Sequence, residues 1–144
     1  MSTRLIRHGE STARGLRGAC LCGSVRVEVT GPIEHQPEAC HCRMCRKQSG
    51  HVLAAVNVRR DALSVGGEQH VRWYRSSDKV ERGFCSKCGS TLFWKPTIEG
   101  YQLTAVAMGL FDGPTGLHLS KHTFVGDRGD YYEITDGLPQ SDSY

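Results

Sequence analysis

Seven cysteines in a chain of 144 residues constrain this protein more than any other feature of its sequence. They form three short groups of Cys-x-Cys or Cys-x-x-Cys spacing: Cys20 and Cys22; Cys40, Cys42 and Cys45; Cys85 and Cys88. In an extended segment, residues i and i+2 point to the same side, so a Cys-x-Cys can present both thiols to one ion. An odd number of cysteines also argues against a complete set of disulfides. The pattern therefore favours metal ligation over cross-linking.

The grouping predicts two different zinc sites, and hence two zinc ions per chain. The pairs Cys20/Cys22 and Cys85/Cys88 supply the four thiolates of a closed tetrahedral structural site. Metal binding at such a site contributes folding free energy directly. The remaining cluster of Cys40, Cys42 and Cys45 has no fourth cysteine to complete it. Three protein ligands and one exchangeable position are what catalytic zinc sites share, so we expect this cluster to hold a catalytic zinc.

The three-cysteine cluster also allows other interpretations. A histidine could complete it as a second structural site, and His41, His51 and His122 are the candidates. His41 is the weakest of these, because the flanking cysteines would point to the opposite face of an extended segment. An iron–sulfur cluster needs only thiolates, although this spacing differs from the usual ones. The sequence alone leaves these alternatives open.

Short apolar runs separated by turn residues predict an all-β domain. Residues 25–29 alternate valine with polar residues, which is the period of a half-buried strand, and Gly31-Pro32 ends the run. We expect further strands and one helical turn, the strands over 52–58, 71–75, 80–84, 91–95, 101–108, 118–125 and 131–135 and the helical turn over 43–49. We predict a flexible N-terminal segment (1–16), one zinc-binding domain (17–138) and a tail (139–144).

The composition narrows the classes of function. The formal net charge of +3 is dispersed, without a run of Lys or Arg, so we expect no nucleic-acid partner. No apolar stretch approaches the ~20 residues that a membrane helix needs, and no apolar region follows the N-terminus. We therefore expect no membrane association and a cytoplasmic location, where clustered thiols stay reduced. Homo-oligomerisation is left open.

Residues 5–12, LIRHGEST, resemble the phosphate-binding signature of the histidine phosphatase superfamily. In that family the motif follows a core strand of a parallel sheet and needs further Arg and His residues downstream. No alternating strand–helix pattern follows it here. We therefore interpret these residues as part of the N-terminal segment rather than as a phosphatase site.

The cysteine-bearing segments resemble those of the glutathione-dependent formaldehyde-activating enzyme family, which includes the domain of centromere protein V. The matching segments are GACLCGSV (18–25), CHCRMCRKQSG (40–50), FCSKCGSTL (84–92), and 122–127, 131–134 and 136–139 near the C-terminal end. The resemblance implies a zinc-stapled β-tent of short antiparallel strands. It also implies a structural zinc on Cys20, Cys22, Cys85 and Cys88, and a catalytic zinc on Cys40, Cys42 and Cys45.

The family's named activity is the condensation of formaldehyde with glutathione to S-hydroxymethylglutathione, a carbon–sulfur lyase reaction run in reverse. An open zinc site suits it, because zinc can deprotonate a bound thiol or polarise an aldehyde oxygen. Arg43, Arg46 and Lys47 are candidate partners for the two carboxylates of glutathione, or else solvated surface charges. Gln48 and Ser49 could donate hydrogen bonds near the metal or cap the helical turn. The alternatives are a zinc enzyme of the same family with another small substrate, and a non-enzymatic zinc-binding module.

Overall fold

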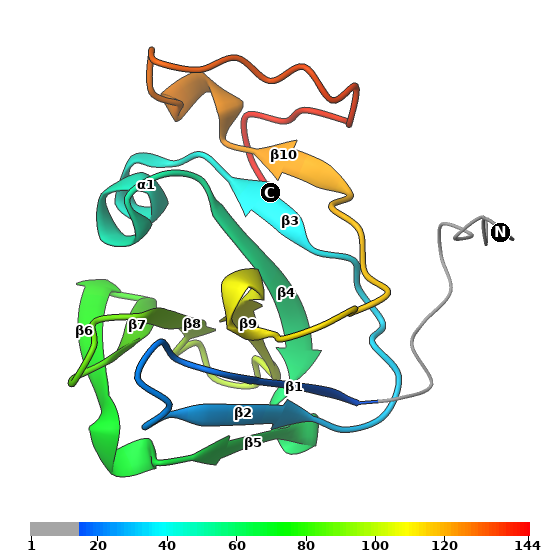
Figure 1. Ribbon diagram of the computed structural model, residues 1–144. Helices are drawn as coiled ribbons and strands as arrows, with labels where there is room; N and C mark the ends of the chain where they lie inside the picture. Colours follow the sequence, from blue (N-terminus) through cyan, green and yellow to red (C-terminus); the bar gives the residue numbers. More distant parts are fainter. Residues whose placement is uncertain (1–14) are drawn as a thin grey trace, which may run out of the picture.

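The strands of the computed structural model, which describes residues 15–144, form two sheets (Figure 1). The smaller sheet contains, in spatial order, β1 (Leu16–Ala19), β2 (Arg26–Val29) and β5 (Leu63–Gly66). The larger sheet contains, in spatial order, β10 (Lys121–Thr123), β3 (Glu38–Cys40), β4 (Leu53–Arg59), β9 (Leu103–Ala107), β8 (Thr91–Pro96), β7 (Val80–Cys85) and β6 (Val71–Ser77). The prediction of an all-β fold is confirmed.

One short α-helix, α1 (Arg43–Ser49), joins β3 to β4 and has the bounds expected for the helical turn. Its C-terminal cap is Gly50 at φ 91°, a left-handed conformation that glycine adopts without strain. In the described part of the chain, four single-turn 3-10 helices lie in connections, at Arg60–Ala62, Glu68–His70, Met108–Leu110 and Val125–Asp127. Among the described residues, no helix is long and apolar enough to cross a membrane.

Pairing is antiparallel between neighbouring strands, except that β10 pairs in parallel with β3. In this parallel pair, His122 lies opposite Ala39 and Thr123 opposite Cys40. The C-terminal part of the chain therefore borders the strand that carries the first cysteine of the three-cysteine cluster, as Figure 1 shows at the upper edge of the larger sheet.

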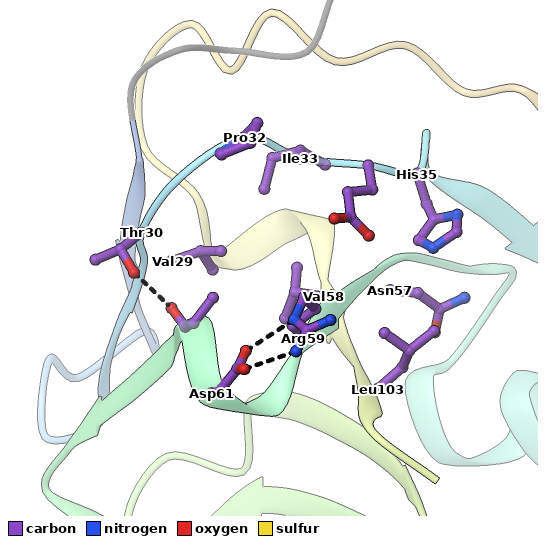
Figure 2. A pocket seen from close by; sticks show the side chains of 12 residues that line it. Val29, Thr30, Pro32, Ile33, His35, Asn57, Val58, Arg59, Asp61 and Leu103 are labelled. Atoms are coloured by element: carbon purple, nitrogen blue, oxygen red, sulfur yellow. Dashed lines mark hydrogen bonds and ion pairs between the residues drawn. The ribbon is translucent and has the colours of Figure 1, made fainter.

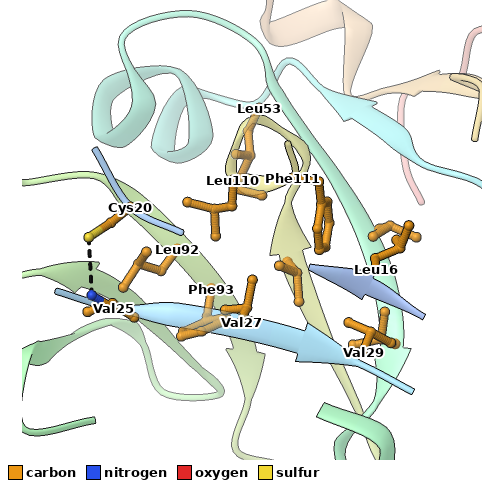
Figure 3. Close-up of a cluster of buried hydrophobic side chains, with 14 of the residues drawn as sticks. Leu16, Cys20, Val25, Val27, Val29, Leu53, Leu92, Phe93, Leu110 and Phe111 are labelled. Carbon is orange, nitrogen blue, oxygen red and sulfur yellow. Dashed lines mark hydrogen bonds between the residues drawn. The ribbon is translucent and has the colours of Figure 1, made fainter. Parts of the chain in front are cut away.

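The hydrophobic core lies between the two sheets (Figure 3). Val25, Val27 and Val29 are all buried, as their alternation predicted, and face side chains such as Leu92 and Phe93 of β8. Burial of an aliphatic or aromatic side chain of this size stabilises the fold by about 1.5–3 kcal/mol. The three-stranded sheet therefore covers the inner face of the larger sheet.

Three strands were not expected from the sequence, and one expected strand is absent. β1, β3 and β5 have four residues or fewer, too few for an alternating pattern to emerge. The prediction of a strand over 131–135 is wrong, because these residues have no regular secondary structure. Tyr131 and Tyr132 instead direct their rings and hydroxyls to histidines.

The phosphatase-like motif at 5–12 lies outside the described residues, as does the predicted N-terminal segment up to residue 14. β1 begins at Leu16, and Gln140 in the predicted tail forms an isolated bridge with His122. The domain boundaries themselves stay predictions.

Candidate metal centres

The fold gathers the cysteines into the two groups that their spacing predicted. The Sγ atoms of Cys20, Cys22, Cys85 and Cys88 all lie within 4.8 Å of one another, and the same holds for Cys40, Cys42 and Cys45. The first group connects the turn between β1 and β2 to the turn between β7 and β8. The second group lies where β3 passes into α1. Each group could hold a metal ion.

The spacing of the sulfur atoms in the four-cysteine group fits a tetrahedral zinc ion. The Sγ atom of Cys20 lies 3.6 Å from that of Cys22 and 3.7 Å from that of Cys85, and the Sγ atoms of Cys22 and Cys85 are 3.8 Å apart. A tetrahedron with Zn–S bonds of about 2.3 Å has edges of about 3.8 Å. All seven cysteines are free thiols. The donor set and its dimensions therefore suit zinc.

Two matching turns build this group. The sequence Cys-Gly-Ser occurs at 22–24 and again at 88–90, and both glycines have φ 78°. The amide of Gly23 donates to the carbonyl of Cys20, and that of Gly89 to the carbonyl of Cys85, at 3.0 and 2.8 Å. Each turn needs the left-handed backbone that glycine provides, and it folds the second cysteine of its pair back toward the first.

The serines of these turns also favour thiolates, which are the form that binds metal. Ser24 Oγ lies 3.3 Å from Cys22 Sγ, and this hydroxyl lowers the pKa of Cys22. Ser90 Oγ lies 3.2 Å from Cys88 Sγ and lowers the pKa of Cys88 to about 5. The sequence reasoning missed both serines, although the repeated Cys-Gly-Ser was the signal that could have found them.

The three-cysteine group is organised by the start of α1. Cys42 is the N-cap residue, and its Sγ accepts a hydrogen bond from the amide of Cys45 at 3.3 Å. Hydrogen bonds from the thiols of Cys40 and Cys45 lower the pKa of Cys42, whereas hydrogen bonding with Cys40 and Cys42 raises the pKa of Cys45. The Cys42 thiol is therefore the more readily deprotonated of these two, and a divalent cation would allow all three thiols to lose their protons.

A buried arginine faces the same group. Arg82 on β7 is only 3% exposed, and its Nη1 donates to Cys45 Sγ at 3.4 Å. Its Nε donates to Ser76 Oγ at 3.0 Å. A buried guanidinium needs such partners, and negative charge on the cysteines satisfies it best. The sequence reasoning missed Arg82, because a charged residue in an alternating strand normally faces solvent.

Each of the three candidate histidines is hydrogen-bonded to residues outside the three-cysteine group. His41 Nδ1 lies 2.5 Å from the hydroxyl of Tyr132, and His41 Nε2 lies 2.8 Å from Nδ1 of His122. His122 Nε2 lies 2.7 Å from a carboxylate oxygen of Asp136. His51 Nδ1 contacts the hydroxyl of Tyr131 at 2.7 Å. Within residues 15–144, no His, Asp, Glu or further Cys joins the three thiols as a possible fourth ligand.

The polar residues of α1 take different roles. The Ser49 hydroxyl donates to the carbonyls of Cys45 and His51, so it caps the end of the helix, as one of the two interpretations expected. Arg46 keeps its Nε buried without a hydrogen-bond partner among the described residues.

Two cavities differ in their relation to the cysteines. The cavity in Figure 2 has a volume of about 160 Å³ and lies where the connection after β2 meets the end of β4. None of the described residues that line it is a cysteine, and the paired Arg59 and Asp61 lie at its edge. The other cavity, of about 340 Å³, is lined by Arg82 and by Gln48 of α1. Among the described residues, neither lining includes a cysteine, but Arg82 of the larger cavity also donates to Cys45, which places this cavity next to the three-cysteine group.

Comparison with known proteins agrees with this architecture. Residues 15–127 match the family model described as glutathione-dependent formaldehyde-activating enzyme. A Halomonas elongata protein with that provisional name is 31% identical over 131 residues, which cover 83% of this chain and 80% of the relative. An uncharacterized lyase of Schizosaccharomyces pombe is 28% identical over 121 residues, 83% of this chain and 85% of the relative.

A crystal structure of a Rhodobacter sphaeroides protein has a similar fold, with a TM-score of 0.58 at 23% sequence identity, and covers 69% of this chain and 90% of that protein. With the matched family model spanning most of the described residues, the resemblance seen in the sequence is confirmed. The chain belongs to the glutathione-dependent formaldehyde-activating enzyme family.

Proposed function

We propose that this protein is a zinc-dependent carbon–sulfur lyase that condenses glutathione, or a similar thiol, with formaldehyde or a related aldehyde to give S-hydroxymethylglutathione or its analogue. One observation carries the proposal. Three thiols gather at the start of α1 without a fourth His, Cys, Asp or Glu ligand among the described residues, and Arg82, which donates to one of them, lines a cavity large enough for a small molecule. Family membership supports the same reaction class.

In the proposed assignment, zinc at Cys20, Cys22, Cys85 and Cys88 is structural, whereas zinc at Cys40, Cys42 and Cys45 is catalytic. The second ion, when bound, would supply Lewis acidity and lower the pKa of a thiol at its exchangeable position. The reaction needs both a thiolate nucleophile and a polarised carbonyl. The sulfur of the substrate adds to the carbonyl carbon, the C=O double bond becomes single, and the thiol proton ends on the new hydroxyl.

The chain's own residues hold the charge of this site. Three thiolates around a divalent ion leave a net charge of about −1. Arg82 is the buried cation that faces this charge, through its hydrogen bond to Cys45. The backbone amide of Cys45 holds the Cys42 sulfur in place. Together these contacts fix two of the three ligands before any substrate enters.

The experiment is a comparison of rates, because formaldehyde also adds to thiols without a catalyst. Exchange between ¹³C-formaldehyde and S-hydroxymethylglutathione is followed by NMR, with and without zinc-loaded protein. We expect the wild-type protein to accelerate exchange above the buffer rate and Cys42→Ser to abolish the acceleration. Equal exchange rates in buffer, wild type and variant would refute the proposed activity.

A further inference from the structure

The cavity of about 340 Å³ is formed by one face of the β6–β7 hairpin and by α1. The strand register places Arg72 opposite Phe84 and Tyr74 opposite Arg82, so these four side chains share a face. The complete lining consists of Gln48, Arg72, Trp73, Tyr74, Arg82 and Phe84. The cavity therefore combines an aromatic wall with two guanidinium groups.

Two residues that line this cavity connect it to the three-cysteine group. Arg82 lines it and donates to Cys45 Sγ at 3.4 Å. Gln48 also lines it, and it follows Cys45 by three residues in α1, a spacing that puts both on one side of a helix. A molecule in contact with Arg82 in the cavity would therefore be one side chain away from the Cys45 sulfur.

The charges of the lining favour an anion. Arg72 and Arg82 are both cationic, and none of the described lining residues is acidic. Arg82 is committed to Cys45 and Ser76. Arg72 is exposed and has no hydrogen bond or ion pair with any residue in the described part of the chain. Its guanidinium is thus free to form a two-pronged pair with a carboxylate.

The aromatic wall is open to a ligand as well. The side chains of Tyr74 and Trp73 are 64% and 40% exposed, although both are large and mainly apolar. Exposed aromatic residues beside cations suit a carbon skeleton that carries a carboxylate.

We propose that Arg72 gives this cavity its preference for carboxylate-bearing thiols: its guanidinium pairs with the carboxylate, Tyr74 packs on the carbon skeleton, and the sulfur points toward the three-cysteine group. The inference rests on the proposed function and deepens it, because it names Arg72 as the residue that determines specificity for an anionic thiol. The neutral ester of the same thiol lacks the group that Arg72 recognises.

The test is a binding measurement that needs no turnover. S-methylglutathione cannot add to an aldehyde, because a methyl group caps its sulfur, and its diethyl ester lacks both carboxylates. Isothermal titration calorimetry with zinc-loaded protein compares the two. We expect the wild type to bind the acid about tenfold more tightly than the ester, and Arg72→Gln to lose this preference.

Arg75→Gln is the matched control. Arg75 lies on the same strand but points to the other face, where it donates to the carbonyl of Asp78 and lies 3.9 Å from Glu81. This variant should keep the wild-type preference. No detectable binding of the acid, equal affinity for acid and ester in the wild type, or equal losses in the two variants would each overturn the proposal.

The two proposals fail in different ways. A lost acid preference in Arg72→Gln together with no acceleration of formaldehyde exchange refutes the lyase and supports the binding site. Acceleration by the wild type together with unchanged thiol selectivity in Arg72→Gln supports the lyase and refutes the role of Arg72. Circular dichroism of Arg72→Gln confirms that a lost preference reflects the side chain rather than the fold.

Discussion

Replacing one cysteine in each group tests whether the two sites differ in their contribution to the fold. Cys85 is fully buried, and Cys22, with which it would share a metal ion, lies 63 residues earlier. Losing a cross-link across a loop of this length costs about 4 kcal/mol of chain entropy. The buried serine hydroxyl left in Cys85→Ser costs about 1–3 kcal/mol more if it is unsatisfied. We expect Cys85→Ser to lose about 5–7 kcal/mol, comparable with the whole stability of a small domain.

Cys42→Ser should behave differently, because Cys42 is the N-cap of α1 and accepts a hydrogen bond from the amide of Cys45. Serine is among the preferred N-cap residues and can accept the same bond. We expect the free energy of unfolding to change by no more than about 1 kcal/mol. Urea denaturation followed by circular dichroism measures both variants. Equal destabilisation of the two would refute the division into a structural and an open site.

Two further side-chain replacements test the surroundings of the three-cysteine group. Arg82→Met removes the buried cation that donates to Cys45, so we expect the metal affinity of the three-cysteine group to fall by about 10–100-fold. Competition with a chromophoric chelator measures this affinity, and an unchanged value would contradict the role of Arg82. Tyr132→Phe removes the contact with His41 Nδ1, and we expect a loss of about 1–2 kcal/mol in urea denaturation. Tyr131→Phe is the control, because the hydroxyl of Tyr131 contacts His51 at an exposed position, so its removal should cost less stability. Equal losses of stability in the two variants would contradict a structural role for the contact between Tyr132 and His41.

The sequence predicted the features that depend on local spacing. The division of the cysteines, the helical turn at 43–49 and the longer strands all follow from periodicity within a few residues. Spacing was sufficient for the cysteines, because each pair or cluster is formed within a single turn or strand end. The pairing of Cys20 and Cys22 with Cys85 and Cys88 joins residues distant in sequence. It could still be predicted, because seven cysteines in three groups can be combined in few ways.

Features that depend on contacts distant in sequence were missed. Arg82 lies 37 residues from Cys45, and nothing in its own strand indicates that its side chain is buried. The contact between His41 and Tyr132 joins residues 91 positions apart. Residues 131–135 were expected as one of the last short strands, whereas the rings of Tyr131 and Tyr132 pack on histidines instead. Local sequence spacing does not report such tertiary contacts, and these contacts determine the conformation of this segment.

The most direct test of the account is the metal content of the purified protein, measured by elemental analysis before and after mild chelation, with circular dichroism as a check on folding. The account predicts two zinc ions per chain, one of which leaves readily while the protein stays folded, because only the four-cysteine group connects the two sheets. One zinc per chain, or two that leave only when the protein unfolds, would contradict the claim that Cys40, Cys42 and Cys45 form an open catalytic site.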